Sequence, residues 1–368
     1  MKILTIVSAG LGRPDRAELT LMERSDEYPR VSLYERILES DMLDEKFMQN
    51  VPRVRRALYR FLPMVLAQVI EAYLIRKRYD AVITWAERLG LPFALILKIT
   101  GSKTPHLMLS SWISKRKKAM MVKFVQSHIT KIFMWSTVQR DYAINVLGIP
   151  SSKIAFVRKF ADQQFWRPMQ RETDIICSVG AEMRDYPTLI EAMRGLDIRC
   201  HIAAAKPRGK TYSTITAIEK IGQLPPNVTA EPKSYKDLRE LYARSRFVVV
   251  PLLQSETDNG LTCILEAMAM GKAVICSKTK GQIDVIKEGE TGIYVPQGDH
   301  FALREVIQRL WNNPEEAERM GKQARKVLEE RHTFEQFVYS VRAIVEEVIR
   351  KKTPSRAFNV TEVYEKVT

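Results

Sequence analysis

The sequence predicts an α/β protein built from two Rossmann-like, doubly wound domains that face each other across a cleft. The chain has 368 residues, and a prior of ~150 residues per domain makes two domains the natural expectation. In both halves, short β-rich runs alternate with longer amphipathic stretches, as in βαβ units around a parallel sheet. Ligands of such sheets bind beyond the carboxyl ends of the strands, so chemistry is expected in the cleft.

Four β-rich runs are expected to form strands in the first half. They are KILTIVSA (2–9), DAVITWA (80–86), HLMLSS (106–111) and KIFMWS (131–136). The stretch VRRALYRFLPMVLAQVIEAYLIRKR (54–78) is expected to be helical. Its apolar part is interrupted by Gln68 and Glu71 and is shorter than the ~20 residues of a membrane span, which favours a core helix. The opening MKILTIVSAG is interpreted as a first buried strand and not as a signal peptide.

The second half repeats the alternation. Its expected strands are IICSVG (175–180), CHIAAA (200–205), FVVVPL (247–252), AVICS (273–277) and GIYVP (292–296). Its expected helices are TLIEAMRGL (188–196), DLRELYARS (237–245), LTCILEAMAM (261–270) and FALREVIQRLW (301–311), with a last helix over residues 333–352. Residues 159–174, with Pro168, interrupt both patterns and predict a hinge. We therefore expect an N-terminal domain (1–165), a C-terminal domain (166–340), and a C-terminal helix and tail (341–368).

The charge is concentrated in the first half. Residues 1–160 hold 27 Lys and Arg against 14 Asp and Glu, a net charge of +13, whereas the remainder carries a net charge of only +2. Such a field attracts nucleic acid, anionic lipid or phosphorylated substrates, and charge alone does not choose among them. The four cysteines have no metal-like spacing and lie in or beside apolar segments, which favours buried thiols of a reducing, cytoplasmic compartment (Cys177, Cys200, Cys263 and Cys276).

Two acids lie close to a helix that is otherwise apolar. Asp258 follows the strand-like run FVVVPLL, the expected helix begins near Gly260 or Leu261, and Glu266 lies inside it. A helix N-terminus binds anions such as a diphosphate, and Glu266 lies ~7.5 Å along the axis from Leu261, about one ribose away. The alternative is a partly buried Glu266 paired with a cation and an Asp258 that serves only as a turn or cap residue.

The residues around these acids resemble a known family. ILEAMAMGKAVI followed by GQIDVIKEGETGIYVPQGD resembles the hallmark of retaining glycosyltransferases with the GT-B fold, specifically family GT4, and the likeness extends over residues 175–299. The resemblance implies that Glu266 binds ribose hydroxyls and that Asp258 binds hydroxyls of the donor sugar at the catalytic centre. Glu256 is a rival for the sugar role, because the family usually has Glu where this chain has Asp258. The remaining donor-binding residues that we expect around the helix start are Gly260, Leu261, Thr262 and Gly281.

SVGAEMRDYPTLIEA (178–192) resembles the family's stretch that neutralises the donor diphosphate. Gly180 matches, Ala181 occupies the usual Arg position, and Arg184 falls on the family's Lys if the loop is two residues shorter. Arg184, as a catalytic cation, and Lys206 would then stabilise the departing diphosphate. A surface salt bridge is the alternative role for Arg184. By the same resemblance, Tyr235 lies near the loop over the nucleotide base.

On the acceptor side, the resemblance is weaker. GLGRP after the first strand resembles the family's glycine-containing turn, which makes Gly10 and Gly12 candidates, although an ordinary tight turn explains them as well. Ser110 and Ser111 stand about where the family often has a His, whereas His106 comes too early and is interpreted as a strand residue. Family members need no strong protein base, because the leaving phosphate takes the acceptor's proton.

A basic amphipathic segment, WISKRKKAMMVKFVQSHITK (112–131), follows the fourth expected strand. Its cluster of Lys and Arg beside Trp, Met and Phe suits a helix lying on an anionic bilayer, at the inner face of a membrane. A solvated helix packed by its apolar side on the sheet explains the pattern nearly as well.

The expected function is that of a hexosyltransferase-type glycosyltransferase (EC 2.4) that uses a nucleotide-diphosphate sugar and retains the anomeric configuration. The acceptor is open among a glycan, a lipid and a small molecule. No metal site or other cofactor is expected, since no metal-like cluster is visible. The alternatives are a non-catalytic nucleotide-sugar-binding protein and a basic polyanion-binding protein of the same fold. No nucleic acid is expected as a partner, because the basic half has no aromatic stacking motif.

Overall fold

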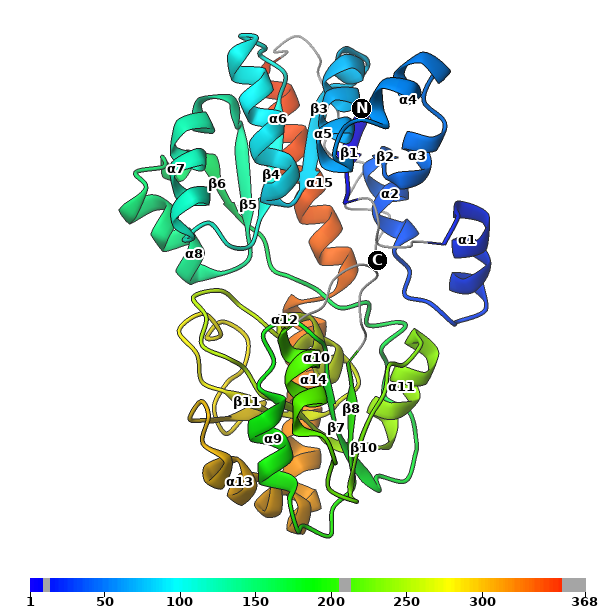
Figure 1. Ribbon diagram of the computed structural model, residues 1–368, viewed down its shortest axis with the longest axis vertical. Coiled ribbons are helices and arrows are strands. Elements are labelled where there is room, and N and C mark those ends of the chain that lie inside the picture. Colours follow the sequence, from blue (N-terminus) through cyan, green and yellow to red (C-terminus); the bar gives the residue numbers. More distant parts are fainter. Residues whose placement is uncertain (9–13, 205–212, 353–368) are drawn as a thin grey trace.

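The computed structural model describes residues 1–8, 14–204 and 213–352, and it contains two parallel six-stranded sheets flanked by helices (Figure 1). The predicted two-domain α/β architecture is therefore confirmed. The first sheet has the order β2-β1-β3-β4-β5-β6, with strands β1 (Ile3–Ile6), β2 (Ser40–Leu43), β3 (Ala81–Trp85), β4 (His106–Ser110), β5 (Lys131–Met134) and β6 (Ile154–Phe156). The second has the order β12-β11-β10-β7-β8-β9, with β7 (Ile175–Val179), β8 (Cys200–Ala203), β9 (Val228–Ala230), β10 (Ser245–Val250), β11 (Ala273–Ser277) and β12 (Gly292–Val295).

The expected strands are all present, and His106 begins β4 as a buried strand residue. Strands β2, β6 and β9 were not expected from the sequence. All three lie at sheet edges, where one side of the strand has no neighbour. The central strands of both sheets are almost completely buried, because helices cover both faces of each sheet.

The first sheet is covered on one face by a layer of helices that comes from its own domain. The long helical stretch predicted over residues 54–78 is two helices, and this prediction is wrong in its continuity. Pro63 lacks a backbone N–H and disfavours helical geometry in the residue before it, so the chain turns at Phe61 and Leu62. The helices of this domain are α1 (Arg16–Arg24), α2 (Ser32–Leu38), α3 (Glu45–Gln49), α4 (Arg53–Tyr59), α5 (Met64–Ile75), α6 (Glu87–Ile99), α7 (Arg116–Val125) and α8 (Thr137–Asp141).

The second sheet is flanked by α9 and α13 on one face and by α11, α12 and α14 on the other. The helices of this part are α9 (Tyr186–Met193), α10 (Ser213–Ile221), α11 (Tyr235–Arg244), α12 (Leu261–Ala269), α13 (His300–Asn312) and α14 (Pro314–Arg331). Among the described residues, no helix is both long enough and apolar enough to cross a bilayer.

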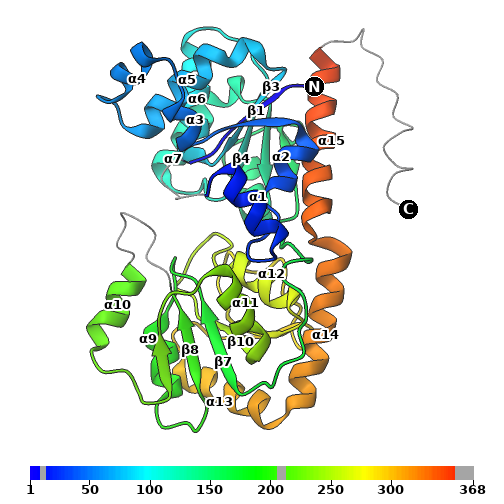
Figure 2. The ribbon, with the colours of Figure 1, turned by 90° about the vertical axis from the view of Figure 1, so that its right-hand side faces the viewer.

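The last helix, α15 (Phe334–Lys352), returns to the first domain. Figure 2 shows it continuing upward from α14 and lying along the first sheet, on the side opposite to α4–α7. Its apolar side chains share one buried cluster with the first sheet and α2, and these are Phe334, Phe337, Val338, Val341, Val345 and Val348. The chain thus crosses between the sheets twice, once at residues 157–174 and once near Thr333. Residues 353–368 of the expected tail lie outside the described residues.

Candidate functional site

Helix α12 begins at the carboxyl end of β10 and points its first turn at the space between the two sheets. Gly260 precedes it with a φ of +85°, and a Cβ at this position would come within 2.9 Å of the Val250 side chain. Only glycine fits this turn without strain. Seven of the nine helix residues are apolar and buried, because α12 lies between α14 and the sheet. The exceptions are Thr262 and Glu266, which are one helical turn apart and lie on the same face.

Glu266 lies in the wall of a cavity of about 400 Å³ between the domains. Its Oε2 accepts a hydrogen bond of 3.0 Å from the hydroxyl of Tyr242 on α11, and Thr262 lines the same cavity. Burial raises the pKa of Glu266 to about 7, although the Tyr242 hydrogen bond and the charges of Lys159 and Arg184 act in the opposite direction. A carboxyl group that faces a cavity with a pKa this far above its usual range is typical of a functional site.

Asp258 is also buried, in the loop between β10 and α12. Its Oδ1 lies 3.0 Å from the hydroxyl of Thr257, while its Oδ2 is buried and has no hydrogen-bond partner among the described residues. Burial raises the pKa of Asp258, and the charge of Lys159 is the largest effect in the opposite direction. Glu256, the rival acid, has an exposed side chain. A buried carboxylate oxygen without a hydrogen-bond partner is energetically unfavourable. A bound ligand with hydroxyl groups would therefore stabilise Asp258 more than it would stabilise the exposed Glu256.

Arg184 lies buried beneath the start of α12. Its guanidinium donates to the carbonyl oxygens of Val179 (3.0 Å) and Glu182 (2.7 Å), and it contacts the Cys263 sulfur at 3.1 Å. Gly180, with a φ of +104°, makes room for it, because a Cβ there would lie 2.5 Å from the Arg184 side chain. The alternative of a surface salt bridge is wrong, since Arg184 is only 6% exposed. Its charge and the helix dipole both make the potential at the first turn of α12 more positive.

Gly281 holds the Asp258 loop from the other side. Its N–H donates to the carbonyl of Ser255 at 3.0 Å, and a Cβ on it would lie 2.2 Å from the carbonyl oxygen of Thr257. The two backbones therefore touch where Gly281 stands, which is a structural role. The predicted role in ligand binding is not tested by this contact and stays a prediction.

The cavity is built from both domains and from the segment that joins them. Among the described residues that line it, Lys159 is the only one with a positive charge. Its ammonium lies 5.2 Å from the ring centroid of Trp135, another lining residue. The sixteen lining residues are Pro29, Val31, Trp85, Ala86, Leu109, Ser111, Trp135, Lys159, Phe160, Ala161, Asp162, Trp166, Tyr235, Thr262, Glu266 and Phe334.

Aromatic rings close one end of the cavity. Tyr235 begins α11, with its ring centroid 4.6 Å from that of Tyr28 and 6.2 Å from that of Trp166. Tyr235 and Trp166 both line the cavity, and Tyr235 is 40% exposed, so its ring is available to a ligand. Aromatic faces at this end suit the stacking of a planar base.

On the side of the first domain, Ser111 lines the cavity and Ser110 does not. The Ser110 hydroxyl donates to Glu87 at 2.9 Å, and the N–H groups of Ser111 and Trp112 donate to the same carboxylate oxygen, so Glu87 fixes the loop after β4. The other predicted acceptor-side residues, Gly10 and Gly12, lie outside the described residues, as does Lys206.

Direct hydrogen bonds bring the two domains together around the cavity. Thr137, at the start of α8, donates from its N–H (2.8 Å) and its hydroxyl (2.6 Å) to Asp284 of the second domain. The hydroxyl of Thr257 lies 2.8 Å from the carbonyl oxygen of Ser111, and the side-chain amide of Gln139 donates to the carbonyl of Glu256 at 2.9 Å. The loop that carries Asp258 is therefore in contact with the first domain.

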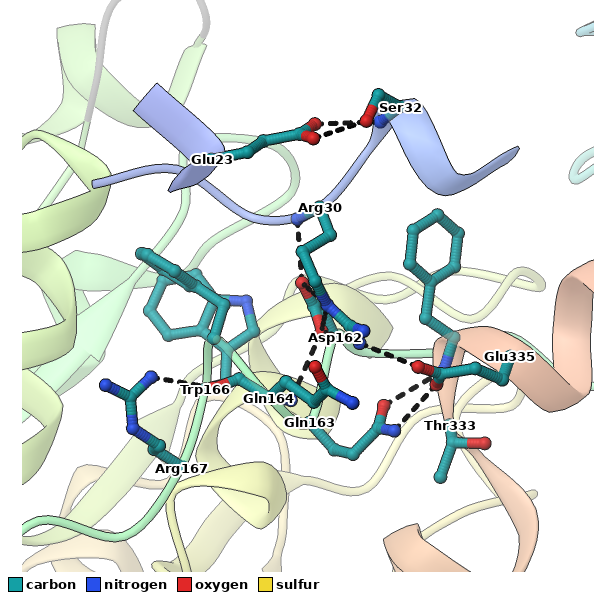
Figure 3. A network of polar contacts seen from close by, with 12 residues as sticks. Glu23, Arg30, Ser32, Asp162, Gln163, Gln164, Trp166, Arg167, Thr333 and Glu335 are labelled. Carbon is teal, nitrogen blue, oxygen red and sulfur yellow. Dashed lines mark hydrogen bonds and ion pairs between the residues drawn. The ribbon is translucent and has the colours of Figure 1, made fainter. Parts of the chain in front are cut away.

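A second set of contacts fixes the linkers. Figure 3 shows Arg30 between Asp162 of the first linker and Glu335 at the start of α15. The guanidinium of Arg30 approaches Asp162 at 2.5 Å and Glu335 at 2.9 Å, and the Arg30 N–H also donates to Asp162 at 2.7 Å. Asp162 is nearly buried, so this network ties the N-terminal segment to both crossings between the domains.

Lys159, Trp166 and Tyr242 are among the site residues that the sequence did not indicate as candidates. Lys159 lies inside the predicted hinge, and a hinge between facing domains borders the cleft, so a cation there was a usable signal. Trp166 lies in the same hinge. Tyr242 gave no signal, because an apolar-facing Tyr in an amphipathic helix is an ordinary core residue.

Comparison with known proteins agrees with this geometry. Residues 162–327 match the profile of the family described as "Glycosyl transferases group 1". The "Putative glycosyltransferase EpsD" of Bacillus subtilis (strain 168) is 26% identical over 164 residues, which are 42% of this chain and 41% of that protein. The alignment thus spans less than half of the length of this curated relative.

Solved structures match over nearly the whole chain. Sucrose-phosphate synthase from Thermosynechococcus elongatus has a TM-score of 0.74 at 18% identity, with 95% of this chain and 99% of that chain covered. HepE of Anabaena, solved in complex with UDP-glucose, has a TM-score of 0.66 at 15% identity, with coverage of 95% and 100%. Likeness at such identities shows the fold, and it confirms the predicted GT-B architecture. Residues 162–327 are therefore similar to the glycosyl transferases group 1 family, and the chain has the GT-B fold.

Proposed function

We propose that this protein is a glycosyltransferase that moves a hexose from a nucleotide-diphosphate sugar to an acceptor, with retention of the anomeric configuration. One observation carries the proposal: the carboxylate of Glu266 lines the cavity between the domains, on a helix whose N-terminal turn opens at the same cavity. The group 1 domain and the UDP-glucose complex of HepE, a protein of the same fold, support a nucleotide-sugar donor.

In this proposal the donor lies across the start of α12. The first-turn N–H groups of α12 hold the diphosphate, Glu266 accepts hydrogen bonds from ribose hydroxyls, and the base stacks near Tyr235. The hexose hangs on the other side of the diphosphate, where Asp258 accepts hydrogen bonds from its hydroxyls. The unpartnered Oδ2 of Asp258 supports this assignment. The acceptor, which is a glycan, a lipid or a small molecule, enters from the side of Ser111.

The chemical step needs positive charge more than a protein base. The bond between the anomeric carbon and the diphosphate oxygen breaks, an acceptor oxygen forms the new bond on the same face, and the acceptor's proton passes to the departing diphosphate. Charge accumulates on that diphosphate, so preorganised positive groups lower the barrier. The start of α12, Arg184 beneath it and Lys159 in the cavity wall supply that field. We propose that no metal is required, and undiminished transfer in the presence of EDTA tests this.

The experiment is a panel of UDP-, GDP-, ADP- and dTDP-sugars, first in thermal-shift assays and then in transfer and donor-hydrolysis assays. We expect one nucleotide class to stabilise the protein, and that class to be turned over to a product whose anomeric configuration in NMR equals that of the donor. Binding without transfer or hydrolysis, over a broad acceptor panel, would assign the chain to the non-catalytic binding proteins. An inverted product would refute retention and leave the donor site standing.

A further inference from the structure

Helix α4 and the turn after it display large apolar side chains to solvent. Val54 is 76% exposed, Leu58 is 62% exposed and Phe61 is 86% exposed. Their spacing of four and three residues places them on one side of the helical segment, so they form a single stripe. No residue of α4 is buried. Scattered apolar residues are normal on a surface, but an aligned stripe that ends in an almost fully exposed Phe is not.

The opposite side of α4 is held firmly by polar contacts. Arg55 pairs at 3.1 Å with Glu71 of α5, which is buried, and the hydroxyl of Tyr59 donates to the same carboxylate at 2.8 Å. Arg56 donates to the carbonyl of Gln49 at 2.7 Å. These contacts fix the rotation of α4 about its axis. The apolar stripe therefore faces solvent because of specific packing contacts and not because the helix is poorly held.

Lys and Arg outnumber acids along the chain around the stripe, although Glu45 on the neighbouring α3 is exposed. Residues 51–79 contain seven Lys and Arg and a single acid, Glu71, which is buried. Arg53 and Arg60 are exposed beside the stripe. Residues 88–140 add ten Lys and Arg and no Asp or Glu. This second run includes α7, whose Ala119, Val122 and Val125 are buried.

The same layer of helices carries the exposed part of α7. Met120 is 66% exposed and Phe124 is 56% exposed, next to exposed Lys117 and Lys123. Helix α5 packs on α6 and α6 packs on α7. In Figure 2, α4, α5, α6 and α7 all lie on the side of the first sheet that faces away from α15. Both apolar and basic clusters thus belong to one side of the first domain.

We propose that this side of the first domain docks on an anionic lipid bilayer, with the α4 stripe (Val54, Leu58 and Phe61) inserted between headgroups. Binding to an anionic membrane surface is favoured by both features, because apolar side chains enter the headgroup region while Lys and Arg interact with anionic lipid headgroups. A nucleic acid would use the charges but would leave Phe61 and Leu58 in water. An acidic protein partner is the remaining alternative, and it would not depend on lipid. The proposal is independent of the donor chemistry.

The test is co-sedimentation of the full chain with vesicles of phosphatidylcholine alone and of phosphatidylcholine mixed with phosphatidylglycerol. Binding is expected only to the mixed vesicles and is expected to weaken with salt. Phe61→Ser should lower the partition coefficient several-fold, and Val54→Ser/Leu58→Ser/Phe61→Ser should lower it by roughly tenfold or more. The matched control is Phe301→Ser on α13, which removes a Phe that is 74% exposed in the other domain and should change nothing.

Charge is tested separately with Arg53→Gln/Arg60→Gln, against Lys322→Gln/Lys326→Gln on α14 as a control of equal charge change. All substituted side chains are exposed, so thermal unfolding should stay unchanged and loss of binding should not reflect misfolding. The proposal is overturned if the wild-type protein does not bind anionic vesicles, or if the stripe variants bind these vesicles as tightly as the wild type does. It is also overturned if a short DNA duplex binds in a manner sensitive to Arg53→Gln/Arg60→Gln and insensitive to Phe61→Ser, while vesicles do not bind.

Discussion

The hydroxyl of Tyr242 donates a 3.0 Å hydrogen bond to Glu266, and this contact joins α11 to α12 at the wall of the interdomain cavity. Burial together with the neighbouring Glu266 charge raises the pKa of Tyr242 far above its usual range, so the phenol remains a donor at all working pH values. The carboxylate has one oxygen held by the protein and one available to a ligand. Orientation of Glu266 toward the cavity therefore depends on Tyr242.

Removal of that donor should change the titration of the acid. In Tyr242→Phe, Glu266 loses a hydrogen bond that favours its charged form, so its pKa should rise above about 7. Donor affinity measured by calorimetry should then reach its plateau at a higher pH than in wild type, and stability should fall by roughly 0.5–1.5 kcal/mol. Tyr339→Phe, at a half-exposed position on α15, serves as the control. An unchanged pH profile would mean that Glu266 does not titrate in the binding step.

The raised pKa of Glu266 also predicts how stability depends on pH. In the unfolded chain this carboxyl titrates near 4.5, and in the folded protein near 7, so between these values the folded state binds more protons. Stability from this group is therefore fully present below about pH 4.5 and is lost as the pH rises to about 7. Compared with wild type, Glu266→Gln should show a smaller loss of denaturation midpoint between about pH 5 and about pH 8. Parallel profiles of the two proteins would contradict the shift.

The three acids near α12 should respond differently to substitution. Glu266→Ala should weaken donor binding by roughly 1.5–3 kcal/mol, since it removes charge-assisted hydrogen bonds to the ribose. Asp258→Ala should reduce turnover of the nucleotide sugar while binding of the free nucleotide diphosphate stays near wild type. Glu256→Ala, at an exposed side chain, should have little effect on either. If Glu256→Ala abolished turnover and Asp258→Ala did not, the sugar role would belong to Glu256.

Lys159 should matter more than its place in a linker suggests. Lys159→Met removes the only positive charge among the described lining residues, so kcat/KM should fall roughly ten- to a hundredfold. Lys159→Arg should restore much of the loss because the charge is kept. Lys322→Met, on the exposed surface of α14, is the control. Equal activity of Lys159→Met and wild type would leave Arg184 and the helix as the sole source of the stabilising field.

The Arg30 network should hold the linkers by more than a surface ion pair could. Arg30→Met leaves the nearly buried Asp162 without its charge partner and should lower stability by roughly 3 kcal/mol. In Arg30→Met/Asp162→Asn the loss should be smaller than the sum of the two single losses, as measured in a denaturant double-mutant cycle. The exposed pair Arg194 and Glu191 is the reference, and its cycle should give less than about 1 kcal/mol. Strict additivity at Arg30 and Asp162 would show that they do not act together.

What the sequence could predict of the fold follows from burial. Strands β1, β3, β4, β5, β7, β8, β10 and β11 lie inside the sheets and are mostly apolar, so their sequences were recognised as strands. The overlooked strands β2, β6 and β9 are edge strands that are short or partly exposed, so their pattern resembles a loop (SDML, IAF and VTA). The edge strand β12 (GIYV) was predicted because it is apolar and mostly buried. The packing of α15 on the first sheet could not be predicted either, because the amphipathic pattern of a helix does not determine which sheet its apolar face covers.

At the site, the sequence indicated the acids and glycines but not their support. Glu266 was conspicuous as a charge in an apolar helix, and Gly260 marked a turn that only glycine allows. Tyr242 and Lys159 are far from Glu266 in the sequence and come close to it only in the folded protein, so the sequence did not indicate them. Arg184 lies in the loop that the sequence indicated. Its buried position beneath α12 could not be predicted, because it depends on the space at Gly180 and on the contact with Cys263.

The most direct measurement is a crystal structure of the protein soaked with the nucleotide-diphosphate sugar that the donor panel selects. The proposed donor site predicts phosphate density against the first turn of α12, ribose hydroxyls within hydrogen-bond distance of Glu266, and the hexose beside Asp258. A nucleotide bound elsewhere, or a Glu266 carboxylate that keeps to Tyr242 and makes no contact with the ribose, would contradict it.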